Sequence, residues 1–216
     1  MSVYSFYTPS PTSFVLLWRI EASSAILKAQ LNPLFADHFD DCSISSNEKI
    51  RQSLSVRLAL DALLKRLGLP IVALLKDARG RPFLKNSNLY ISFSHTHYFA
   101  SVALSTSFPI GIDIEMIRPK LAVVQEKVLT NKEAEHADSC LEKLAIYWCA
   151  KEALYKLLDN QEGYKFKKIF IEPFQLQTEG YVLAHLNKKK YVMHYKRIAC
   201  GPDELPHFCL CCEDQA

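Results

Sequence analysis

The sequence has few glycines, a small net charge and no long hydrophobic run, and each of these features argues against a class of protein. Glycine accounts for only six of its 216 residues and no low-complexity stretch interrupts the chain, so we expect a compact protein without a hinge. The formal net charge of +3 is too small to indicate nucleic-acid binding, which requires a clustered basic surface. An apolar run over residues 14–20 is far shorter than the roughly 20 residues that span a bilayer. We therefore expect neither a nucleic-acid partner nor a membrane partner.

A secretion signal is also missing, and this bears on the cysteines. Residues 1–11 lack the basic start and the apolar core of a signal peptide. Seven cysteines are present, an odd number, so at least one thiol cannot pair within the chain. We expect a reducing cytoplasm as the location and cysteines that serve as small core residues. A C-terminal group of possible metal ligands comprises His207, Cys209, Cys211 and Cys212. Its spacing does not match a zinc ribbon, so we prefer a thiol-rich last strand to a metal site.

The hydrophobic pattern predicts a mixture of helices and strands. Hydrophobic residues make up 49% of the chain and charged residues 23%, which is ordinary for a globular protein of one large or two small domains. Helical spacing predicts long helices over residues 48–68 and 139–158, with a partly helical segment between 119 and 138. Strand-like patterns occur over residues 14–20, 71–75, 89–93, 98–105, 110–115, 168–174, 176–186, 191–198 and 208–212.

The order of these elements indicates two related halves. Each half contains one long helix that is followed by strands, and the boundary is expected between residues 107 and 108. The residue-level similarity between the halves is too weak to identify a sequence repeat. The sequence therefore predicts an α+β fold with an N-terminal half over 1–107 and a C-terminal half over 108–216.

Two carboxylates alternate with isoleucines in the strand over residues 110–115. Because successive side chains in a strand point to opposite faces, Asp113 and Glu115 share one face, roughly 6–7 Å apart between Cα atoms. Hard oxygen ligands of this kind suit magnesium, which also coordinates substrate phosphates. The alternative is a half-exposed strand whose polar face is simply hydrated.

A third carboxylate lies on the second long helix. At about 100° per residue, Glu152 falls within an apolar stripe, where a carboxylate is costly unless a cation or hydrogen bonds stabilise it. Lys156, four residues on, offers an ordinary ion pair. The more specific interpretation is that Glu152 is a third ligand to the ion held by the two strand acids. The stripe comprises Leu141, Leu144, Ala145, Trp148 and Tyr155.

Several residues are candidates for binding phosphate. Ser94 and His95 follow a strand, and strand-end loops often carry function. Arg81 in a Gly-Arg-Pro turn and Arg51 and Arg57 on the first long helix offer forked donors that suit phosphate oxygens. Solvated surface charges, and a local hydrogen-bonding role for the histidine, are the alternatives.

The motifs occur together in an order that resembles the signature of the Sfp-type 4′-phosphopantetheinyl transferases. The matching segments are Gly-Arg-Pro at 80–82, Phe-Ser-His-Thr at 93–96, Gly-Ile-Asp-Ile-Glu at 111–115 and Trp-Cys-Ala-Lys-Glu-Ala-Leu-Tyr-Lys at 148–156. Arg51 and Arg57 also resemble family positions. Arg81 replaces the family's usual lysine, and Asp159 stands where a glycine often follows the helix.

The resemblance implies specific roles for these residues. Magnesium would be held by Asp113, Glu115 and Glu152 on the pyrophosphate of coenzyme A. The nucleotide end of coenzyme A would be bound by His95, most directly at its 3′-phosphate, together with Ser94 and Arg81. Lys151 and Lys156 would lie along the phosphates. The family fold is a pseudo-symmetric pair of α+β halves, each with a long helix on a small antiparallel sheet, that binds the cofactor between them.

The expected activity is transfer of 4′-phosphopantetheine from coenzyme A to a serine of an apo acyl or peptidyl carrier protein. Glu152 would act as the base, with Lys156 and Asp113 also catalytic, in a monomeric enzyme. Two alternatives stay open: a coenzyme A-binding protein without transferase activity, and a metal-dependent phosphohydrolase. A purely structural or adaptor role leaves the acid on the apolar stripe of the helix unexplained.

Overall fold

The computed structural model describes residues 3–36, 46–158, 166–201 and 204–214 and divides into two compact units, Met1–Pro109 and Ile110–Ala216. Within the described ranges, no helix combines the length and the hydropathy that a membrane span requires. The expectation about Asp159 lies outside the described residues.

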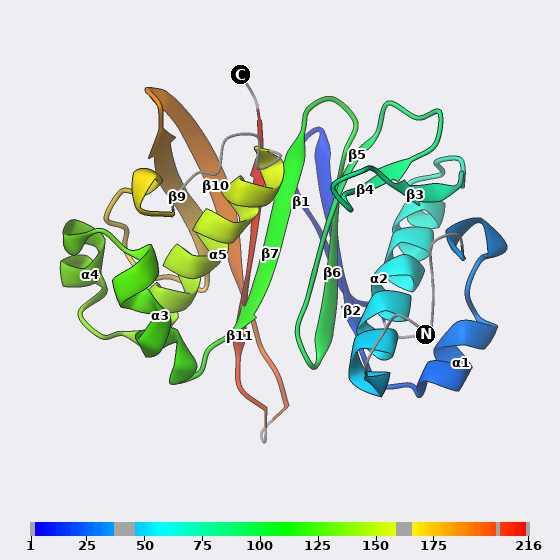
Figure 1. Ribbon diagram of the computed structural model, residues 1–216, viewed down its shortest axis with the longest axis horizontal. Helices are drawn as coiled ribbons and strands as arrows, with labels where there is room; N and C mark the ends of the chain where they lie inside the picture. The colour runs from blue at the N-terminus through cyan, green and yellow to red at the C-terminus, as the bar shows by residue number, and fades with distance from the viewer. Residues whose placement is uncertain (1–2, 37–45, 159–165, 202–203, 215–216) are drawn as a thin grey trace. The chain divides into compact units, whose positions relative to one another are not determined.

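The first unit packs one long helix on an antiparallel sheet of four strands (Figure 1). Its elements are β1 (Val3–Ser10), β2 (Ser13–Arg19), α1 (Ser24–Ala29), η1 (Pro33–Phe35), α2 (Asn47–Arg66), β3 (Leu74–Lys76), β4 (Pro82–Leu84), β5 (Tyr90–His95) and β6 (Phe99–Ser105). The sheet has the order β1-β2-β6-β5, and β3 pairs separately with β4. Ser46 caps the start of α2, because its side chain accepts a hydrogen bond from the Lys49 amide. The helix ends before Gly68, whose positive φ suits a helix terminus.

The second unit packs helix α5 on an antiparallel sheet of five strands, with two shorter helices beside it (Figure 1). Its elements are β7 (Ile110–Met116), α3 (Lys120–Val128), α4 (Asn131–Ala137), α5 (Leu141–Leu157), η3 (Phe166–Lys168), β8 (Phe170–Ile171), β9 (Glu179–Leu186), β10 (Lys189–Ile198) and β11 (His207–Glu213). The sheet has the order β7-β11-β10-β9-β8, so β7 is an edge strand. Helix α5 packs against β7 and β11.

Three strands of each unit pair in a corresponding order, although the two sheets differ outside these strands. The strand ahead of the long helix, β2 or β7, pairs with the last strand of its unit, β6 or β11, and that strand pairs with β5 or β10 before it. The predicted α+β class and both predicted long helices are confirmed. A pseudo-symmetric relation between the units stays a prediction.

Candidate active site

The carboxylate pair lies on the face of β7 that packs against α5. Gly111, Asp113 and Glu115 alternate along the strand and therefore share a face. A Cβ atom at Gly111 would lie 2.0 Å from the carbonyl oxygen of Ala153 and 2.9 Å from the amide nitrogen of Leu157. The missing side chain lets the α5 backbone approach this face closely. Asp113 and Glu115 consequently lie beside side chains of α5.

Asp113 forms a buried ion pair with the end of α5. The carboxylate is only 6% exposed, and its Oδ1 atom lies 2.7 Å from Nζ of Lys156. The same ammonium donates to the carbonyl oxygen of Ile112 at 3.0 Å. The alternative considered from the sequence was an ion pair between Lys156 and Glu152, whereas the structure pairs Lys156 with Asp113. This pairing fixes the lysine against β7, next to the candidate ligands.

The pKa values of Glu115 and Glu152 are shifted by neighbouring acids. Burial raises the pKa of Glu115, and the neighbouring charge of Asp113 raises it further. Burial also raises the pKa of Glu152, with Asp113 and Glu115 adding to the effect while Lys156 opposes it. Mutual influence of this kind requires the carboxylates to lie near one another. The second unit therefore brings the strand pair and the helix acid into one neighbourhood.

This neighbourhood has the chemistry of a cation site, although its side chains do not yet form a ligand set. Three carboxylates lie in this neighbourhood, and carboxylate oxygens are the ligands that a hard divalent ion such as magnesium prefers. Lys156 lies beside Asp113, while the charges of Arg118 and Lys120 act on Glu115. In the parts of the chain that the structure describes, no three His, Cys, Asp or Glu side chains stand together in ligand positions. Asp113, Glu115 and Glu152 fit magnesium as donors, and their side chains would have to reorient to bind it together.

Cys149 is a neighbour of the acids that the sequence pattern did not point out. Its thiol is fully buried and donates to the carbonyl oxygen of Phe208 at 3.5 Å. Burial raises the pKa of this thiol well above its ordinary value, and the charges of Asp113 and Glu115 raise it further. Cys149 is therefore a neutral thiol beside the carboxylates of Asp113 and Glu115. Cys149 lies one turn before Ala153 on α5, so helix periodicity could have predicted that both residues lie on the same face.

Glu152 is less central on its helix than the predicted stripe implied. Helix α5 is buried around most of its circumference, and the buried positions include Ile146, Tyr147 and Ala150, which lie outside that stripe. Leu141, Trp148, Glu152 and Tyr155 are only half-buried. Glu152 thus lies at the margin of the buried surface, where a carboxylate can reach a ligand.

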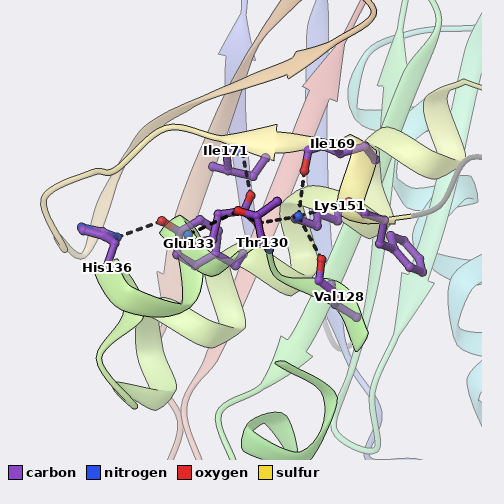
Figure 2. Close-up of polar contacts among 9 residues, drawn as sticks. Val128, Thr130, Glu133, His136, Lys151, Ile169 and Ile171 are labelled. Atoms are coloured by element: carbon purple, nitrogen blue, oxygen red, sulfur yellow. Dashed lines mark hydrogen bonds and ion pairs between the residues drawn. The ribbon is translucent and has the colours of Figure 1, made fainter. Parts of the chain in front are cut away.

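Lys151 occupies a different place from the one expected for it. Its side chain is fully buried, and its ammonium lies 2.7 Å from Oε2 of Glu133 (Figure 2). Burial lowers the pKa of Lys151, while the hydrogen bond and the charge of Glu133 raise it. In this position the ammonium does not lie along a phosphate, which corrects the expectation drawn from the motif. Glu133 itself was missed, although Thr130 and Glu133 have the spacing of a helix capping box.

Two of the expected phosphate ligands in the first unit hold backbone carbonyls of that unit. Arg51 donates to the carbonyl oxygens of Ala22 and Ile20, each at 3.0 Å. Arg57 is buried and donates to the carbonyl oxygen of Phe35 at 3.0 Å and to that of Ser53 at 2.9 Å. Burial lowers the pKa of Arg57. Both arginines thus stabilise their own unit, and their contact with a ligand stays a prediction.

The remaining candidates lie at loops of the first unit. Arg81 immediately precedes β4, in a turn where Oδ1 of Asp77 accepts a hydrogen bond from the Arg81 amide at 2.8 Å. Ser94 and His95 end β5, and His95 is exposed. The turn after them is shaped by Thr96, whose hydroxyl accepts from the amide of Phe99 at 3.2 Å. The candidates for the nucleotide end therefore belong to the first unit, whereas the acids belong to the second.

The α+β fold and the acidic cluster define the class of protein, one with a candidate site for a divalent cation. Comparison with known families is more specific, because residues 109–206 match the family model of the 4′-phosphopantetheinyl transferase superfamily. The matched part holds the three acids and α5, so it is this part of the chain that is similar to the superfamily. No curated protein matches the chain significantly.

Proposed function

We propose that the protein transfers 4′-phosphopantetheine from coenzyme A to a serine of an apo acyl or peptidyl carrier protein and releases adenosine 3′,5′-bisphosphate. The match of residues 109–206 to the superfamily model supports phosphopantetheine transfer in general. The observation that carries the proposal is the placement of Asp113, Glu115 and Glu152 in one neighbourhood between β7 and α5. Such a site can hold a divalent cation against a pyrophosphate.

Magnesium would be held by Asp113, Glu115 and Glu152, and when bound it would offset negative charge on the pyrophosphate oxygens. Lys156 complements this role. Its ammonium lies on Asp113 and is 29% exposed, so it can donate to a phosphate oxygen at the surface of the site. A fixed donor of this kind stabilises charge that grows during phosphoryl transfer.

Glu152 is the proposed base. The serine hydroxyl of the carrier is a poor nucleophile at neutral pH and needs an acceptor for its proton. Burial raises the pKa of Glu152, which makes this carboxylate a stronger base than an exposed glutamate. The serine oxygen forms a bond to the β-phosphorus, the bond from that phosphorus to the bridging oxygen breaks, and Glu152 takes the hydroxyl proton. Adenosine 3′,5′-bisphosphate leaves with the bridging oxygen.

In this proposal the half over residues 1–107 binds the nucleotide end of coenzyme A, and the half over 108–216 carries the metal and the catalytic residues. Arg81, Ser94 and His95 are the proposed ligands of the nucleotide. Arg51 and Arg57, which also hold backbone carbonyl groups of the first unit, stay further candidates for this end. Lys151 stabilises the second unit, as its buried position indicates. We also propose a cytoplasmic monomer; the location is supported by the six described cysteines, none of which is joined in a disulfide.

Incubation with magnesium, coenzyme A and a panel of apo carrier proteins tests the proposal. A modified carrier should gain the mass of phosphopantetheine. Glu152→Ala should lower kcat by at least about 100-fold, the usual contribution of a general base. Glu135→Ala is the matched control because it removes an exposed glutamate of α4 in the same unit.

Other outcomes would assign another function. Calorimetric binding of coenzyme A without any mass gain on a carrier would indicate a binding protein. Release of inorganic phosphate in the absence of a carrier would indicate a phosphohydrolase. Full transfer activity in Glu152→Ala would refute the assignment of the base.

A further inference from the structure

A buried network around Lys151 and Glu133 is not used by the proposed chemistry. The ammonium of Lys151 lies 2.7 Å from Oε2 of Glu133 and has three backbone carbonyl oxygens as further acceptors (Figure 2). These belong to Ile169 at 2.7 Å, Val128 at 3.0 Å and Phe166 at 3.1 Å. An ammonium has three N–H donors, so four acceptors leave none for a ligand.

Both carboxylate oxygens of Glu133 also accept hydrogen bonds from groups of the same unit. Its Oε2 atom accepts from the amide of Thr130 at 2.7 Å and from the hydroxyl of Thr130 at 3.0 Å. Its Oε1 atom accepts from the amide of Ile171 at 2.8 Å. Glu133 is only 1% exposed, so both partners of the ion pair are removed from water. Their hydrogen bonds compensate for the loss of hydration.

The network joins α5 to four other elements. Val128 ends α3, Glu133 lies in the first turn of α4, Phe166 begins η3 and Ile171 ends β8. Figure 2 shows Val128, Glu133 and Ile169 around the Lys151 ammonium, while Ile171 contacts Glu133. Because each contact is a directional hydrogen bond, a change in the rotation of α5 would break several of them at once.

Lys151 holds α5 from the side opposite to β7. Successive residues of a helix are about 100° apart, so Lys151 is about 160° around the axis from Ala153 and from Cys149. Ala153 is the residue whose carbonyl group packs on Gly111 of β7. The helix is therefore fixed on one side by backbone contact with β7 and on the other by the buried ion pair. Glu152, between these two contacts in the sequence, has its direction set by both.

We propose that Lys151 and Glu133 are positioning residues, which hold α5 in the rotation that directs Glu152 and Lys156 at the reacting groups. This inference rests on the proposed function. A pair of apolar residues could fill the same space at similar stability, but it would lack the hydrogen bonds that specify one rotation. Small errors in the position of a catalytic group are costly, since about 1 Å can reduce a rate 100-fold.

Steady-state kinetics of Lys151→Met and Glu133→Gln, measured with apo carrier and coenzyme A, test the proposal. We expect kcat to fall at least about 10-fold in each folded variant, while the KM for coenzyme A stays within about twofold. Rates are normalised to the folded fraction from circular dichroism. Glu133→Gln keeps an oxygen that can accept from Thr130 or Ile171, so it gives an answer even if Lys151→Met does not fold. Lys196→Met, which removes an exposed ion pair with Glu179, is the control and should keep the wild-type kcat.

Calorimetry of coenzyme A binding provides a second readout. Unchanged affinity in both variants, together with the lower kcat, supports a positioning role. A large increase in KM with kcat retained would show that Lys151 contacts coenzyme A, and an unchanged kcat in folded variants would show a purely structural pair; either result overturns the proposal. Failure of the wild-type chain to modify any carrier overturns the proposed function itself, and the wild-type reactions alone reveal that outcome.

Discussion

Replacement of Gly111 by alanine perturbs the contact that brings β7 and α5 together. The added Cβ would lie 2.0 Å from the Ala153 carbonyl oxygen and 2.9 Å from the Leu157 amide nitrogen. Both atoms belong to the backbone of α5, so no side-chain rotation relieves the clash. Carbon and oxygen atoms in ordinary contact are about 3.4 Å or more apart, so the helix must move by more than about 1 Å.

Two consequences follow from this displacement. Overpacking of a close contact costs typically about 1–3 kcal/mol, and we expect at least this loss in the free energy of unfolding. The movement also separates Lys156 from Asp113, which now lie 2.7 Å apart, and displaces Glu152 with the same helix. A shift of about 1 Å at a catalytic group can lower kcat about 100-fold. The variant should therefore lose activity even where it remains folded.

Urea unfolding and the carrier-modification assay measure the two effects separately. Gly201→Ala is the matched control, because among the described residues outside its chain neighbours the nearest atom would lie 3.8 Å from a Cβ there. Its stability and activity should equal those of the wild type. If Gly111→Ala unfolds at the wild-type urea concentration and keeps its full kcat, the close packing of α5 on β7 is not what positions the acids, and the reasoning fails.

The other predictions concern acid stability, a buried hydroxyl and the metal. Burial lowers the pKa of His194, so its neutral form favours folding above about pH 6.5 and this stability declines as the pH falls toward the folded pKa; in urea titrations His194→Gln should flatten the decline. Tyr147→Phe removes a 2.8 Å hydrogen bond with His136 and should cost about 1 kcal/mol of unfolding free energy in the same assay. A chelator should stop carrier modification, added magnesium should restore it, and transfer that continues in excess chelator would contradict the assignment of the three acids.

The elements that the sequence predicted well carry local signals. Ser46 and Gly68 bound α2 as a cap and a terminating glycine, as expected from their residue types. Alternation alone placed Asp113 and Glu115 on one face of a strand. The edge strand β1 was missed because its residues are only exposed or half-buried, so hydrophobic alternation is weak there.

The segment after α5 shows how tertiary contacts override a local pattern. Residues 168–174 were predicted to form a strand, but only Phe170–Ile171 does so. The carbonyl group of Ile169, just ahead of this strand, accepts a hydrogen bond from the Lys151 ammonium, as does that of Phe166 in η3, so the chain here is directed toward Lys151. A pattern within the segment cannot reveal hydrogen bonds to a lysine that lies some fifteen residues earlier in the sequence.

The motif on α5 joins residues whose roles differ, and helix geometry explains why. Glu152 and Lys156 lie about 40° apart around the axis, so both can face β7, whereas Lys151 lies about 140° from Lys156. A ligand that contacts Glu152 and Lys156 on one face is therefore poorly placed to reach Lys151. The observed burial of Lys151 against Glu133 is the arrangement that this spacing favours. The residues of this motif thus have in common that they belong to α5. Only those that lie on the same face of the helix, such as Glu152 and Lys156, can contact the same ligand.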